Sequence, residues 1–122
     1  MESTNTTKCK TILVADDEPQ IREMLYEYLT SQGYKVIQAI DGQDAVEKFS
    51  VNPHDVCLLI TDVLMPRMDG FSSFEAMSKT KPSLKVLYMS GYLDHSHCDI
   101  NFIRKPFTPI QFLQEINGLL ED

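Results

Sequence analysis

The 122-residue sequence has no long hydrophobic run, few cysteines and a shortage of positive charge. No apolar stretch approaches the ~20 residues that a membrane-spanning helix needs, so we expect no membrane association through such a helix. The N-terminal residues 1–7 lack a basic region followed by an apolar stretch, so we expect no secretory signal there. We expect residues 1–10 to form a flexible N-terminal segment and residues 11–122 to form one domain.

The charge balance is acidic, with 11 Lys and Arg against 18 Asp and Glu, a net charge of −7 and a pI near 4.8. Such a domain is poorly suited to binding nucleic acid through its phosphates, whereas it favours divalent cations and basic partner surfaces. The three cysteines, Cys9, Cys57 and Cys98, are odd in number and have no short paired spacing. They predict reduced thiols, no disulfide framework and a cytoplasmic location.

A short apolar run that ends in a single carboxylate is the most informative stretch. Residues 56–62 read Val-Cys-Leu-Leu-Ile-Thr-Asp, a pattern typical of a strand buried on both faces of a parallel sheet. Pro66 and the Asp69-Gly70 pair mark the next residues as a loop. Ligands of open α/β sheets bind at the carboxyl ends of the strands, so Asp62 is the candidate reactive group.

Strand and helix patterns alternate along the whole chain. Strands are predicted at residues 11–15, 34–39, 56–62, 84–89 and 101–103. Helices are predicted from Pro19 to a Gly33 cap, after Asp41-Gly42, around residues 71–77, and after a Thr108/Gln111 capping box. This order predicts an α/β domain: a five-stranded parallel sheet, doubly wound in the flavodoxin-like (βα)5 arrangement. Residues 91–100 are barely enough for a crossover, which predicts a fourth helix shortened to about one turn or replaced by an irregular loop.

Polar residues follow the predicted strands, and parallel strands direct their carboxyl ends to one edge. Three carboxylates gathered there repel one another unless a cation intervenes, and carboxylate and carbonyl oxygens with water suit Mg²⁺. A lysine supplies a positive charge for a phosphoryl oxygen, and a serine supplies a hydroxyl. This combination predicts phosphoryl transfer to a carboxylate. The residues are Asp16, Asp17, Asp62, Ser90 and Lys105.

The same residues stand in motifs whose order resembles one family. The motifs are Asp16-Asp17, Asp62 followed by residues 65–70 (Met-Pro-Arg-Met-Asp-Gly), Ser90-Gly91 and residues 105–107 (Lys-Pro-Phe). Together they resemble the response-regulator receiver domain of two-component signalling, over residues 11–121. Residues 88–92 (Tyr-Met-Ser-Gly-Tyr), with the short segment after them, are also similar to receiver domains of hybrid histidine kinases.

The resemblance implies a role for each site residue. Asp62 would accept the phosphoryl group of a phosphohistidine, from a histidine kinase or a histidine phosphotransfer protein. Lys105 would contact the phosphoryl group from a loop shaped by a cis Lys105-Pro106 bond. Ser90 would be the switch hydroxyl, and Phe102 would take the place of the switch aromatic. Mg²⁺ would be held by Asp17, Asp62 and the Leu64 main-chain carbonyl, with Asp16 acting directly or through water. Such a domain catalyses its own phosphorylation and dephosphorylation, and is a monomer or weak dimer.

Other interpretations remain open at this point. The same fold could serve as a phosphorylation-independent interaction module, and Phe102 could be a plain core residue. A Mg²⁺-dependent phosphatase would place its nucleophile after the first strand with a second acid two residues on, whereas Asp16 and Asp17 are adjacent. His95, His97 and Cys98 are close in sequence, but a solvated loop explains them better than a metal site.

Overall fold

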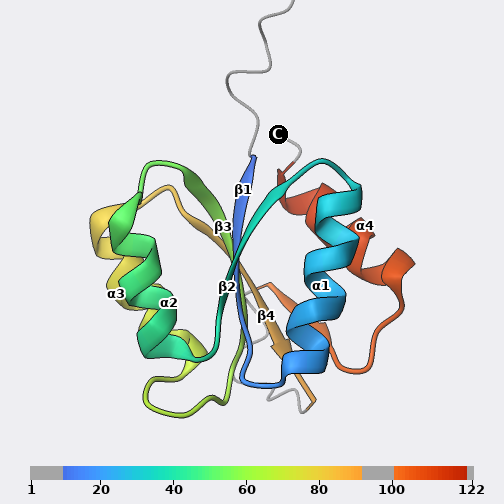
Figure 1. Ribbon diagram of the computed structural model, residues 1–122, viewed down its shortest axis with the longest axis horizontal. Helices are drawn as coiled ribbons and strands as arrows, with labels where there is room; N and C mark the ends of the chain where they lie inside the picture. The colour runs from blue at the N-terminus through green and yellow to red at the C-terminus, as the bar shows by residue number, and fades with distance from the viewer. Residues whose placement is uncertain (1–9, 92–100, 121–122) are drawn as a thin grey trace, which may run out of the picture.

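The computed structural model describes residues 10–91 and 101–120, and it contains the predicted alternation of strands and helices (Figure 1). Strand boundaries differ from the predicted ones by a single residue at most at either end. The elements are β1 (Thr11–Ala15), α1 (Pro19–Ser31), β2 (Lys35–Ala39), α2 (Gly42–Val51), β3 (Val56–Asp62), α3 (Gly70–Thr80), β4 (Lys85–Ser90), β5 (Phe102–Arg104) and α4 (Pro109–Leu120).

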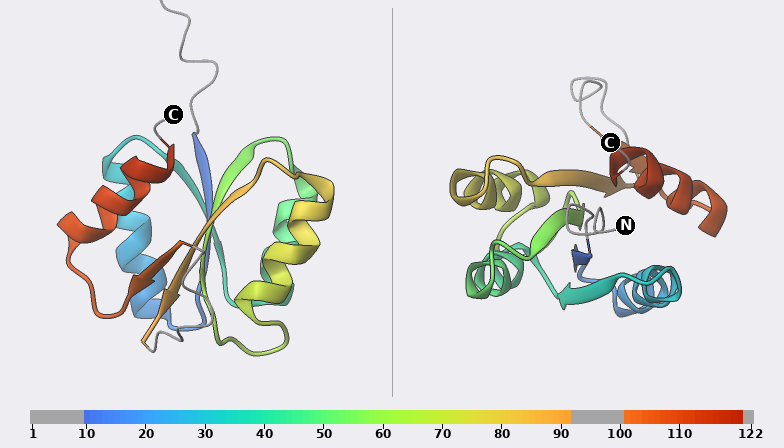
Figure 2. Two further views of the ribbon diagram at one scale, coloured as in Figure 1. Left: turned by 180° about the vertical axis from the view of Figure 1, so that it is seen from behind. Right: turned by 90° about the horizontal axis from the view of Figure 1, so that it is seen from above.

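The strands form one parallel five-stranded sheet in the order β2-β1-β3-β4-β5. Helices α1 and α4 cover one face of the sheet, and α2 and α3 cover the other (Figures 1 and 2). This confirms the predicted doubly wound α/β fold. Strands β1 and β3 are neighbours at the centre, with Ala15 paired to Thr61, so their carboxyl ends lie side by side.

Two apolar cores fix the sheet between its helix layers. Successive side chains of a strand point to opposite faces, so β1 and β3 each contribute side chains to both cores. The core under α1 and α4 contains Ile12, Val14, Leu25, Leu29, Leu58, Ile60, Phe112 and Ile116. The core under α2 and α3 contains Leu13, Ala45, Phe49, Leu59 and Met77. All of these side chains are almost completely buried. The two central strands, β1 and β3, are therefore a rigid support for the residues at their carboxyl ends.

The predicted helix caps are present. The Thr108 N–H donates to Gln111 Oε1 at 2.9 Å and the Gln111 N–H donates to Thr108 Oγ1 at 3.1 Å, which is the predicted capping box. Asp41 Oδ1 accepts the Asp44 N–H at 2.8 Å at the start of α2. Gly33 has a φ of 95°, the left-handed conformation expected after α1.

The shortened fourth helix and most of the N-terminal segment lie outside the described residues. Among the residues that are described, no helix is both long and apolar enough to cross a bilayer. The prediction of reduced thiols is wrong for Cys57, whose sulfur is disulfide-bonded. The spacing of cysteines along the chain could not predict this disulfide, because a disulfide requires two cysteines that the fold brings close together in space.

Candidate functional site

Three carboxylates from two neighbouring strand ends meet at the carboxyl edge of the sheet. Asp16 and Asp17 follow β1 and Asp62 ends β3, and one oxygen of each lies within 4.8 Å of the others. Asp16 is completely buried, Asp17 is exposed, and the Asp62 side chain is 15% exposed. The structure therefore brings together the three acids that the sequence placed at strand ends, with a graded access to solvent.

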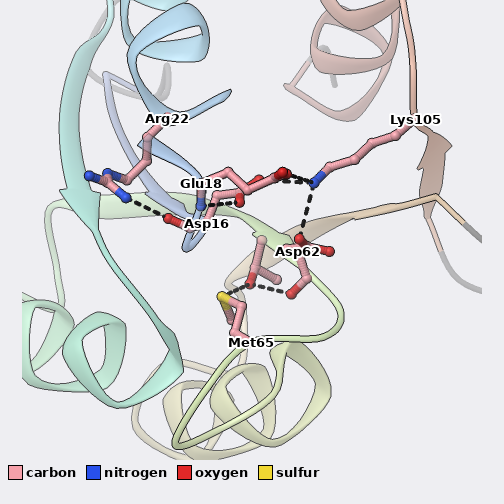
Figure 3. A network of polar contacts seen from close by, with 7 residues as sticks. Asp16, Glu18, Arg22, Asp62, Met65 and Lys105 are labelled. Carbon is pink, nitrogen blue, oxygen red and sulfur yellow. Dashed lines mark hydrogen bonds and ion pairs between the residues drawn. The ribbon is translucent and has the colours of Figure 1, made fainter. Parts of the chain in front are cut away.

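Lys105 reaches across this cluster from the loop after β5 (Figure 3). Its Nζ lies 3.0 Å from Asp62 Oδ2 and 3.1 Å from Asp16 Oδ2. It also lies 3.3 Å from Glu18 Oε1, a contact that the sequence analysis missed. The feature of the sequence that could have indicated Glu18 as a site residue is its acidic side chain directly after the Asp16-Asp17 pair. The Lys105-Pro106 bond is cis, as the resemblance implied.

The buried acid is held by main-chain contacts on three sides. The Asp16 N–H donates to the Ala39 carbonyl oxygen at 3.2 Å, and Asp16 Oδ1 accepts the Glu18 N–H at 2.9 Å. Arg22 Nη1 donates to the Asp16 carbonyl oxygen at 2.8 Å (Figure 3). The first carboxylate of the cluster is therefore fixed in place by β2 and the first turn of α1.

Burial and charge act in opposite directions on this cluster. Burial raises the pKa of Asp16, and the hydrogen bond from Glu18 and the charge of Lys105 only partly offset it. Burial alone would lower the pKa of Lys105, but its hydrogen bond to Asp62 and the charges of Asp16 and Asp62 outweigh burial and raise it to about 12. Lys105 is therefore a permanent cation at physiological pH. The carboxylate form of Asp16 is disfavoured by burial unless a further positive charge binds beside it.

The donor set fits Mg²⁺. Three carboxylates from Asp16, Asp17 and Asp62 supply hard oxygen ligands, the kind Mg²⁺ binds together with water. A divalent cation would also offset the burial that raises the pKa of Asp16. Leu64, whose carbonyl was the fourth predicted ligand, lies two residues past Asp62 with a side chain that is 78% exposed.

The main chain around Asp62 is tightly constrained. A Cβ added at Gly70 would lie 2.4 Å from the Asp62 carbonyl oxygen, so only glycine lets α3 begin this close to the end of β3. Thr61 Oγ1 donates to the same oxygen at 2.9 Å. The Val63 N–H donates to the Met89 carbonyl oxygen at 3.1 Å, which ties the start of the loop to β4. Asp62 therefore presents its carboxylate from a rigid backbone.

Ser90 and Phe102 occupy the positions expected from the sequence. Ser90 ends β4, and its carbonyl oxygen accepts the Lys105 N–H at 2.8 Å, which places the serine beside the lysine loop. Phe102 is half-buried in β5, and its ring centroid lies 5.6 Å from that of Tyr88 and 6.4 Å from that of Phe71. Phe102 is thus a packed aromatic residue in this structure, and its switching role stays a prediction.

A doubly wound parallel sheet that carries a lysine-bridged cluster of acids at its carboxyl edge places the chain in the class of flavodoxin-like α/β domains that bind their ligands at that edge. The chain belongs to the response regulator receiver domain family, which it matches over residues 12–117.

Relatives and solved structures agree with this assignment. The chain is 34% identical to response regulator GtcR of Aneurinibacillus migulanus over 91% of this chain and 48% of the relative. It is 29% identical to sensor kinase CckA of Brucella abortus over 98% of this chain and 13% of that protein. The structure of response regulator TrrA of Thermotoga maritima in complex with Mg²⁺-BeF has a TM-score of 0.79 and 32% identity, covering 91% of this chain and 99% of that one. The chain thus spans about half of one relative and a small part of the other.

Proposed function

We propose that this chain is the phosphoacceptor of a two-component phosphorelay, with Asp62 taking a phosphoryl group from a phosphohistidine. The observation that carries the proposal is the contact of Lys105 Nζ with Asp62 Oδ2 at 3.0 Å, beside two further carboxylates. A nucleophilic carboxylate, a fixed cation and a set of metal ligands are the components that phosphoryl transfer needs, because its catalysis is mostly positioning and charge neutralisation.

The residues of the site divide the tasks of this reaction. An Asp62 oxygen attacks the phosphorus in line with the leaving imidazole; the new O–P bond forms as the P–N bond breaks, and the imidazole leaves with the electron pair. Lys105 neutralises a phosphoryl oxygen, and the Ser90 hydroxyl then donates to another. Asp16, Asp17, Asp62 and the Leu64 carbonyl would hold Mg²⁺, which would supply the remaining positive charge when bound. Phe102 follows the movement of Ser90.

The partners follow from the same chemistry. The phosphohistidine belongs to a histidine kinase or a histidine phosphotransfer protein, and the acidic surface, with its net charge of −7, favours a basic docking surface on that partner. We infer a domain that works as a monomer or weak dimer and does not itself bind nucleic acid. The TrrA complex with Mg²⁺-BeF supports the metal assignment for this site.

The proposal predicts a mass gain of one phosphoryl group when the protein is incubated with acetyl phosphate and Mg²⁺. EDTA should remove the gain, because Asp16, Asp17 and Asp62 would then repel the incoming phosphate without compensation. Intact-protein mass spectrometry at neutral pH measures it. A phosphorylation-independent interaction module would show no gain under either condition, and a phosphatase would release inorganic phosphate continuously without retaining a labelled protein.

A second prediction concerns the lifetime of the phosphoryl group. Leu64 is exposed and follows the acceptor Asp62 by two residues, so we infer that its apolar side chain hinders a water that attacks the phosphoryl group. Leu64→Asn should hydrolyse its phosphoryl group about threefold faster or more, a barrier change below ~1 kcal/mol at the lower bound. The measurement is loss of phosphoryl mass after removal of acetyl phosphate. An unchanged rate would contradict this role, and Leu64→Met, which keeps the apolar bulk, is the control.

A further inference from the structure

The loop between β3 and α3 contains a main-chain conformation that side chains rarely adopt. Arg67 has a φ of 69°. The Met68 N–H donates to the Pro66 carbonyl oxygen at 2.7 Å, so the three residues form a γ-turn with Arg67 at its centre. A γ-turn with positive φ is rare and strained for a residue other than glycine. Such strain persists only where the surrounding structure holds it in place.

The side chain of Arg67 holds this turn. Arg67 Nε lies 2.8 Å from Asp41 Oδ2 and Nη2 lies 3.1 Å from Asp41 Oδ1, a bidentate ion pair. The Asp41 side chain is 8% exposed and is itself fixed, because Oδ1 also accepts the Asp44 N–H as the cap of α2. The strained residue is therefore anchored to a buried, immobile carboxylate on another element.

A second contact ties the same turn to the same helix. A Cβ added at Gly42, the first residue of α2, would lie 2.0 Å from the Met68 carbonyl oxygen. The loop main chain therefore rests directly on the N-terminus of α2. At its two ends the loop is closed by the Gly70 N–H, which donates to the Val63 carbonyl oxygen at 2.8 Å. Leu64 lies inside this closed segment.

We propose that Arg67 and Asp41 form a positioning pair that fixes the β3–α3 loop and thereby strengthens Mg²⁺ binding at Asp16, Asp17 and Asp62. The pair acts through the loop, because it sets where the Leu64 carbonyl stands relative to the Asp62 carboxylate. This inference rests on the proposed function, since it concerns the metal site of that reaction. It adds two residues, one of them at a distant helix cap, to those that determine the metal affinity.

Positioning and simple electrostatics predict opposite results for one of the two residues. If only long-range electrostatics mattered, loss of the Arg67 charge would tighten Mg²⁺ binding, because it would remove the repulsion between two cations. Loss of the Asp41 charge would weaken it on the same ground. A positioning pair instead predicts weaker binding from either loss, because both changes release the same loop. The sign of the Arg67 effect therefore separates the two explanations.

The experiment is a Mg²⁺ titration of the full chain followed by amide chemical shifts, on the wild type, Arg67→Gln, Asp41→Asn and the double variant. Asparagine keeps an oxygen for the helix cap of α2, and its amide nitrogen replaces the oxygen that accepts from Arg67 Nε, so Asp41→Asn breaks the bidentate ion pair and preserves the cap. Each single variant should bind Mg²⁺ about three- to tenfold more weakly, and the double variant no more weakly than the weaker single one. If Arg67→Gln fails to fold, Arg67→Gly replaces it, since glycine accepts a φ of 69° without strain.

The matched control is Lys48→Gln, which removes a positive charge from α2 together with its 3.2 Å ion pair to Asp44 and its hydrogen bond to the Gln38 carbonyl oxygen. It should leave the Mg²⁺ affinity within about twofold of the wild type, as expected for a surface pair. Urea unfolding of all variants measures stability, which a purely structural pair would change without changing the metal affinity. Unchanged or tighter Mg²⁺ binding by Arg67→Gln would overturn the positioning role. A wild-type protein that binds no Mg²⁺ would instead overturn the proposed function.

Discussion

Asp62→Asn is expected to fold normally and to take up no covalent phosphoryl group. The asparagine amide has nearly the shape of the carboxylate, so the packing at the end of β3 is preserved, but the amide oxygen cannot act as the nucleophile. It also removes one charge from the cluster of Asp16, Asp17 and Asp62, so the Mg²⁺ affinity should fall as well. Intact-protein mass after incubation with acetyl phosphate and Mg²⁺ measures the effect, which should reduce the modified fraction to background.

Asp69→Asn is the matched control for this variant. Asp69 stands in the loop that follows Asp62, where its Oδ1 accepts the Ser72 N–H at 2.7 Å as the cap of α3, and asparagine is an equally good cap. This variant should be phosphorylated as the wild type is. Retention of the mass gain by Asp62→Asn would show that another residue accepts the phosphoryl group.

Lys105→Met is expected to destabilise the folded protein and to slow phosphorylation strongly. The change leaves the fully buried Asp16 without its cationic partner, and loss of one member of a buried ion pair costs about 3–5 kcal/mol. Here the cost should lie at or below the lower figure, because Lys105 is partly accessible and Asp16 can take up a proton instead. Urea unfolding at neutral pH measures the loss, and acetyl phosphate labelling measures the slower reaction.

The pH dependence of this destabilisation has a definite sign. Burial already raises the pKa of Asp16 in the folded protein, and loss of Lys105 raises it further. A folded-state pKa above the unfolded value contributes stability below the unfolded pKa, and that stability is lost as the pH rises. The difference in free energy of unfolding between Lys105→Met and the wild type should therefore be smaller in acid and larger near neutral pH.

Mg²⁺ and a surface variant provide the checks on this result. Saturating Mg²⁺ should recover part of the lost stability, because it replaces the missing positive charge beside Asp16. Lys48→Met breaks a solvent-accessible pair with Asp44 and a hydrogen bond from Lys48 Nζ to the Gln38 carbonyl oxygen, and it should cost no more than about 1 kcal/mol. A Lys105→Met protein as stable as the wild type at every pH would contradict the role given to the buried pair.

The features that the sequence predicted are those governed by local pattern. Apolar runs, Pro19 at the start of α1 and the Thr108/Gln111 box determine strands and helices within a few residues of themselves. The parallel order then follows, and with it the gathering of Asp16, Asp62 and Lys105 at one edge, because parallel strands all end on the same side.

The features that escaped prediction depend on contacts between distant segments. The contact of Lys105 with Glu18 joins the loop after β5 to the N-cap of α1, and the Arg67 pair with Asp41 joins two separate loops. The positive φ of Arg67 could not be read from its residue type, since glycine or asparagine is the usual sign of that conformation. The disulfide of Cys57 escaped for the same reason, because cysteine spacing says nothing of which segments the fold brings together.

The most direct test of the account is to locate the phosphoryl group. The protein is labelled with acetyl phosphate and Mg²⁺, the acyl phosphate is trapped by borohydride reduction, and the peptides are sequenced by mass spectrometry. We predict a single reduced residue, Asp62, on the peptide that carries the end of β3. Reduction at Asp16 or Asp17, or a stable phosphate on Ser90 that borohydride leaves untouched, would contradict the assignment of Asp62 as the acceptor.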